Sequence, residues 1–66
     1  MKLTLNGETR DFESCETVSD LLASLRLMEK LVLVELNGHA VQRTDFRSAN
    51  LANGDNVEIV RMVGGG

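Results

Sequence analysis

Two Asn-Gly dipeptides, Asn6-Gly7 and Asn37-Gly38, each stand between two short runs of residues that have strand character. Both central residues of a type I′ turn need a positive φ, which asparagine and glycine adopt at the lowest cost. The 66-residue chain is therefore expected to contain two β-hairpins. Their strands are predicted at residues 1–5, 8–12, 31–36 and 39–41.

A single helix is predicted between the two hairpins. Thr17 and Asp20 have the spacing of a capping box, so the helix is expected to begin at this point. The apolar residues that follow fall at i, i+3, i+4 and i+7 and form one stripe that packs against the sheet. These residues are Val18, Leu21, Leu22 and Leu25. Leu27 and Met28 are expected to belong to the end of the helix and to cover the edge of the core.

The rest of the chain predicts one more strand. Residues 43–53 are expected to hold a short helical turn anchored by Phe46 and Leu51, and Asn53-Gly54-Asp55 a further turn. Residues 57–63 are apolar and β-branched, which is typical of a central strand. The residues expected to face the helix from the sheet are Val32, Val34, Leu36, Val57 and Ile59. This order predicts an α+β domain over residues 1–63, in which a mixed sheet curls around one helix.

Length and composition exclude several classes of function. A chain of 66 residues has no room for a large catalytic cleft, so it is not expected to be an enzyme. A net charge of −3 and only two aromatic residues argue against nucleic-acid binding. The apolar run 31–34 is far too short to cross a membrane. The single Cys15 cannot form an internal disulfide, which favours a cytoplasmic location.

Four residues with reactive side chains are interpreted as ordinary surface or packing residues. Cys15 has no neighbouring histidine in the sequence, so it is read as an incidental thiol. His39 borders a turn and is expected to be exposed. Glu13 and Glu16 are expected to form a solvated acidic surface rather than a catalytic pair. No Cys and His cluster has the spacing of metal ligands, so no metal is expected.

The chain ends in Gly64, Gly65 and Gly66, directly after the last predicted strand. Glycine has no Cβ, so a narrow channel of a partner can close around such a flexible tail, which reaches roughly 10 Å. A carboxylate must be activated, for example as an acyl adenylate, before a nucleophile can attack it. The chain has no Gly-rich phosphate loop with a lysine, so it is expected to bind no cofactor, and the partner must bring ATP. The carboxylate of Gly66 is therefore the predicted working end of the chain.

A docking surface is predicted beside this tail. Alternation along the strands places Leu33, Glu35, Val60 and Met62 on the face of the sheet opposite the core. An exposed apolar patch of this kind is typical of a protein-binding surface. Together with Val63, these residues are the predicted partner-binding residues.

Several of these segments resemble the ThiS family of thiamine-biosynthesis sulfur carriers. The resemblance spans the chain and rests on Thr17-Val18-Ser19-Asp20-Leu21-Leu22, on Leu36-Asn37-Gly38 and on the ending from Asn53-Gly54-Asp55 to Gly66. It implies a β-grasp, ubiquitin-like fold. It also implies that Gly66 is adenylated by a ThiF-type enzyme, receives sulfur from a sulfur donor protein as a thiocarboxylate, and supplies it to a ThiG-type thiazole synthase. Phe46 stands where a tryptophan is expected in many relatives, so an aromatic anchor is retained.

Three other functions remain open from the sequence. A MoaD-like small subunit of molybdopterin synthase shares the fold and the glycine end, although the short length and the Val-Gly-Gly-Gly ending favour the thiamine branch. A ubiquitin-like modifier would join Gly66 to lysines of other proteins. A non-covalent binding module would have an inert tail.

Overall fold

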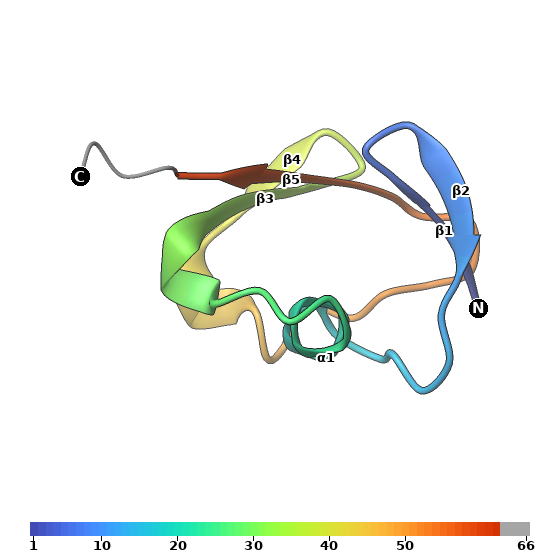
Figure 1. The fold of residues 1–66 in the computed structure, drawn as a ribbon, viewed down its shortest axis with the longest axis horizontal. Coiled ribbons are helices and arrows are strands. Elements are labelled where there is room, and N and C mark those ends of the chain that lie inside the picture. The colour runs from blue at the N-terminus through green and yellow to red at the C-terminus, as the bar shows by residue number, and fades with distance from the viewer. Residues whose placement is uncertain (63–66) are drawn as a thin grey trace.

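The computed structural model describes residues 1–62, which form one mixed sheet with an α-helix across one of its faces (Figure 1). The strands are β1 (Lys2–Leu5), β2 (Glu8–Asp11), β3 (Val32–Leu36), β4 (His39–Val41) and β5 (Asn56–Arg61), and the helix is α1 (Val18–Ser24). Short 3₁₀ turns cover Glu29–Leu31 and Arg43–Asp45. The strand order is β2-β1-β5-β3-β4, with β1 and β5 parallel and the other neighbours antiparallel. The predicted α+β architecture with a central last strand is confirmed.

Both predicted hairpin turns are present. Asn6 and Gly7 have φ values of 49° and 86°, and Asn37 and Gly38 have values of 52° and 85°. These are the positive φ angles that a type I′ turn requires. The sequence therefore predicted both turns correctly from the dipeptides alone.

The two turn asparagines also tie their hairpins to β5. The Asn6 side chain accepts from the Ile59 amide at 2.8 Å and donates to the Ile59 carbonyl at 3.2 Å. The Asn37 side chain accepts from the Asn56 amide at 2.9 Å and donates to Asp55 Oδ1 at 3.1 Å. Each asparagine thus extends the pairing of the central strand, a role that the sequence did not predict.

The capping box at the start of α1 is formed as predicted. Thr17 Oγ1 accepts from the Asp20 amide at 3.2 Å. Asp20 Oδ2 accepts in return from the amides of Glu16 at 2.9 Å and Thr17 at 3.1 Å. These donors, the Glu16 amide first and the Thr17 amide next, hold the pKa of Asp20 below its ordinary value of 3.8.

The helix ends earlier than the sequence predicts. Leu25 is its C-cap, and the Leu27 amide donates to the Leu22 carbonyl at 2.9 Å in a Schellman motif. Arg26 occupies the left-handed position of this motif, with φ of 59°, where glycine is most common. Leu27 is partly buried against the core, but Met28 is exposed, so the prediction that Met28 covers the core was wrong. The chain turns away at Arg26 before Met28 can reach the helix face.

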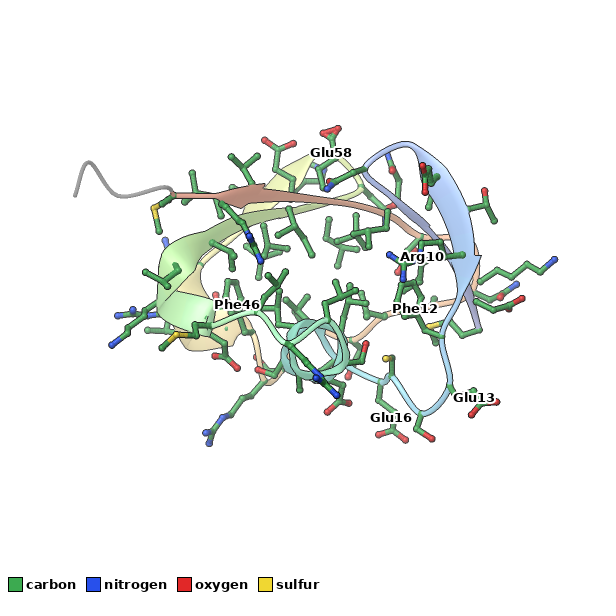
Figure 2. All side chains as sticks on the ribbon, in the orientation of Figure 1. Arg10, Phe12, Glu13, Glu16, Phe46 and Glu58 are labelled. Carbon is green, nitrogen blue, oxygen red and sulfur yellow. The ribbon has the colours of Figure 1, made fainter. Side chains whose placement is uncertain are left out.

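The core lies between α1 and the inner face of the sheet. Val18, Leu21 and Leu22 of the helix stripe are fully buried, whereas Leu25 is only partly buried at its edge. The other buried residues predicted from the sequence are Val32, Val34, Val57, Ile59, Phe46 and Leu51, and Leu36 packs partly against them. Phe46 lies beneath the sheet in Figure 2 and closes one end of the core.

The strands start and stop within two residues of the predicted limits. Leu31 belongs to a 3₁₀ turn rather than to β3 and is exposed. β5 ends at Arg61, and Met62 follows it with an amide that still donates to the Leu31 carbonyl at 2.8 Å. Val63, the predicted last residue of this strand, lies outside the described residues, as does the predicted tail of residues 64–66.

Candidate functional site

The outer face of the sheet carries an apolar pair beside the last strand. Leu33 of β3 and Val60 of β5 are directly opposite each other in the antiparallel register. These residues are 57% and 58% exposed, and their pairing places them side by side on the surface. We call this Leu33–Val60 pair the outer patch. The structure therefore brings together two of the residues predicted to bind a partner.

Two carboxylates lie next to the outer patch. Glu35 of β3 is paired with Glu58 of β5, two residues further along the same register, and both residues are exposed. Figure 2 shows Glu58 on the side of the sheet away from α1. Glu35 was predicted from the sequence, but Glu58 was missed. The signal was present, because Glu58 is two residues from Val60 and so shares its face.

Met62 lies at the point where the described part of the chain ends. Its side chain is 42% exposed and lines a surface hollow with Met28 and Leu31. It is therefore accessible, as predicted, but it stands beyond β5, beside a hollow that also reaches Val32 on the inner face. The predicted partner-binding residue Val63 lies outside the described residues.

The remaining reactive side chains do not converge on a site. Cys15 is a free cysteine buried in the core, and His39 is exposed. Glu13 and Glu16 are exposed on the loop before α1 (Figure 2). Within residues 1–62, no three His, Cys, Asp or Glu side chains are grouped so that they could hold a metal ion. In the same range, no helix is long and apolar enough to cross a membrane.

The last described strand, β5, is an interior strand of the sheet. β5 lies between β1 and β3 and runs toward the end of the molecule away from β1 and β2 (Figure 1). The predicted attachment site Gly66 and the predicted tail residues Gly64 and Gly65 lie outside the described residues.

Comparison with known proteins identifies the family. The model of the ThiS family matches residues 3–66, which include the glycine end. The chain belongs to the ThiS family. The ThiS protein of Geobacter metallireducens, a thiamine biosynthesis protein of known crystal structure, is 36% identical, with a TM-score of 0.83 and complete coverage of both chains. The predicted β-grasp fold and the predicted family are thus confirmed.

The chain covers nearly all of one curated relative and a small part of another. The sulfur carrier protein ThiS of Bacillus subtilis is 38% identical over 65 residues, which are 97% of this chain and 98% of that protein. A thiazole synthase of Paramagnetospirillum magneticum is 39% identical over 66 residues, which are all of this chain but 20% of that protein. At the level of the family, the prediction of a thiamine-biosynthesis sulfur carrier, rather than an enzyme, is confirmed.

Proposed function

We propose that this ThiS-family chain carries sulfur as a thiocarboxylate on Gly66. The observation that carries the proposal is that the family match extends through Gly66, the residue at the end of a segment that leaves a central strand. The family's sulfur carrier of Bacillus subtilis supports it, because that protein has almost the same length as this chain.

The chemistry assigns the activation to a partner. A ThiF-type enzyme would join the Gly66 carboxylate to the AMP part of ATP, with release of pyrophosphate. The terminal sulfur of a persulfide on a sulfur donor protein would then attack the acyl carbon and displace AMP, and a thiol reductant would cleave the resulting acyl disulfide to leave the thiocarboxylate. An unbranched terminal residue leaves that carbon open to attack, and the partner supplies the ATP, so the chain needs no cofactor of its own.

We further propose that the outer patch docks these partners. Leu33 and Val60 supply exposed apolar surface, and Glu35 and Glu58 supply a pair of negative charges beside it. A partner surface with an apolar centre and a basic rim is complementary to this arrangement. A ThiG-type thiazole synthase is the proposed acceptor of the sulfur. Support comes from the longer thiazole synthase that contains a segment similar to all of this chain.

Intact mass spectrometry of the protein from its native cells discriminates among the candidate functions. A thiocarboxylate appears as the replacement of one oxygen by sulfur. A modifier appears as isopeptide adducts on other proteins, and an inert module appears as neither. A molybdopterin-synthase subunit would also carry the thiocarboxylate, but it would be recovered with a molybdopterin-forming subunit rather than with a thiazole synthase.

A further inference from the structure

The main-chain hydrogen bonds of β5 alternate between its two neighbours. Met62, just beyond the strand, donates to Leu31 on the β3 side at 2.8 Å. On the other side, the Val57 carbonyl accepts from the Asn6 amide at 2.9 Å, and both main-chain groups of Ile59 bond to the Asn6 side chain. The main-chain N–H and C=O groups of the odd-numbered residues of β5 therefore point away from β3.

This alternation leaves Arg61 facing an open edge. Its N–H and C=O point toward the β1 side, but β1 has already ended at Leu5 and the chain has turned back at Asn6-Gly7. Among residues 1–62, the Arg61 main chain has no hydrogen-bond partner. An unpaired donor and acceptor on one residue of a strand is the arrangement to which an additional strand binds.

Two surface hollows flank this open edge and share Leu27 and Arg61. The first is lined by Leu5, Asn6, Leu25, Leu27, Ile59 and Arg61. The second adds Arg26, Met28 and Leu31 among its lining residues. Among residues 1–62, no carboxylate side chain lines either hollow, although the chain as a whole has a net charge of −3. The edge therefore combines apolar walls with two positive charges.

Arg26, which lines the second hollow, has a backbone conformation that arginine rarely adopts. Its φ of 59° lies in the left-handed region, which costs a residue with a Cβ on the order of 1 kcal/mol relative to the favoured helical region. Glycine adopts this conformation without that cost and is the usual residue at this position of a Schellman motif. A guanidinium at a position that favours glycine is consistent with a binding role for its charge.

We infer that the open edge of β5 at Arg61 binds an extended segment of the activating enzyme that carries apolar and acidic side chains. This inference rests on the proposed function. Such a segment pairs with the Arg61 N–H and C=O, places an apolar side chain in the hollow beside Leu5 and Ile59, and presents a carboxylate to Arg26 and Arg61.

The same features disfavour a second copy of this chain as the occupant. Pairing two β5 edges would bring Arg61 against Arg61 between two chains that each carry a net charge of −3. An enzyme strand at this edge would instead hold the chain immediately before its tail. From Arg61 to Gly66 an extended chain spans roughly 17 Å, so the paired strand guides the terminus toward the site of adenylation.

Two substitutions at Arg61 separate the main-chain contact from the charge. Arg61→Pro removes the N–H and the guanidinium, whereas Arg61→Ala removes only the guanidinium. Because the Arg61 N–H has no hydrogen bond within the described chain, we expect both variants to melt at similar temperatures.

Binding to the purified ThiF-type enzyme is measured by calorimetry without ATP, so that no chemistry contributes. Arg61→Ala is expected to weaken binding, and Arg61→Pro to weaken it about tenfold more.

A second measurement covers the case in which Arg61→Pro fails to fold. Hydrogen exchange of the wild-type Arg61 amide is followed with and without the enzyme, and the inference predicts slower exchange in the complex. Equal binding by the two variants, or an Arg61 amide that exchanges equally fast in the complex, overturns the inference. If the wild-type chain binds the enzyme and acquires sulfur in a separate incubation with ATP and a sulfur donor, the proposed function survives. Failure of the wild type to acquire sulfur instead overturns the proposed function.

Discussion

Glu35 and Glu58 face each other across β3 and β5 on the outer face of the sheet. Like charges directly opposite in a sheet destabilise the pair, by an amount similar to the roughly 0.2–1 kcal/mol that favourable pairs contribute. The free domain therefore holds an unfavourable contact beside its exposed apolar pair. A basic partner surface would remove the repulsion on docking.

Glu58→Lys tests this interpretation of the outer face. The new lysine lies opposite Glu35, so we expect unfolding free energy to rise by a few tenths of a kcal/mol, up to about 1 kcal/mol. Binding to the activating enzyme is expected to weaken several-fold, because a positive charge meets the basic partner surface. Urea unfolding and calorimetry measure the two effects. Glu13→Lys makes the same change of charge on a distant loop, and equal loss of binding by both variants would remove the outer face from the interface.

Leu22→Ala tests the packing of α1 on the sheet. Leu22 is fully buried, and truncation of a buried leucine costs about 2–5 kcal/mol. A domain of this size has little stability to spare, so we expect the variant to be largely or partly unfolded at room temperature. Leu33→Ala is the matched control, because Leu33 is 57% exposed and its truncation should change the melting temperature little. Similar melting curves for the two variants would contradict the described core.

The capping box makes the stability of the domain depend on pH. The pKa of Asp20 is lower in the folded chain than its ordinary value of 3.8, because the Glu16 and Thr17 amides bond to the ionised form. Asp20 therefore contributes stability above that value, and the contribution is lost as pH falls through the lower folded-state pKa. We expect Asp20→Ala to be less stable than the wild type at neutral pH, and the difference to narrow in acid. A difference that is constant from neutral pH to below 3.8 would contradict this account.

Much of the fold could be predicted because its signals are local. The two Asn-Gly turns, the capping box and the helix stripe each lie within a few residues, and all three were placed correctly. The contact between Asn6 and Ile59 was not predicted, because it joins residues 53 positions apart. The opposition of Glu35 and Glu58 likewise depends on a register that the sequence does not show. The early end of α1 was missed because Arg26 adopts a conformation that more often indicates glycine.

Arg26→Gly tests whether the left-handed conformation of Arg26 lowers the stability of the domain. Glycine removes the strain of the left-handed position, so we expect a gain of up to about 1 kcal/mol in unfolding free energy. Arg26→Ala keeps a Cβ at the same φ and should show no such gain. Both variants lose the guanidinium, so we expect both to bind the activating enzyme with an affinity lowered by the same factor. We also expect the affinity of both variants to depend less on salt concentration than the affinity of the wild type does. Unchanged stability of Arg26→Gly would show that the strain is negligible.

The most direct test of the central claim is the intact mass of the chain after incubation with a ThiF-type enzyme, ATP and a sulfur donor. We predict that the wild type exchanges one oxygen for sulfur, whereas a chain lacking Gly66 and Gly66→Val do not, although all three melt alike. Deletion withdraws the carboxylate by roughly 3.5 Å, and even about 1 Å of misplacement can cost on the order of a hundredfold in rate. Valine retains the reach but adds a branched Cβ beside the reacting carbon. Equal charging of both variants and the wild type would contradict the assignment of Gly66 as the sulfur-carrying residue.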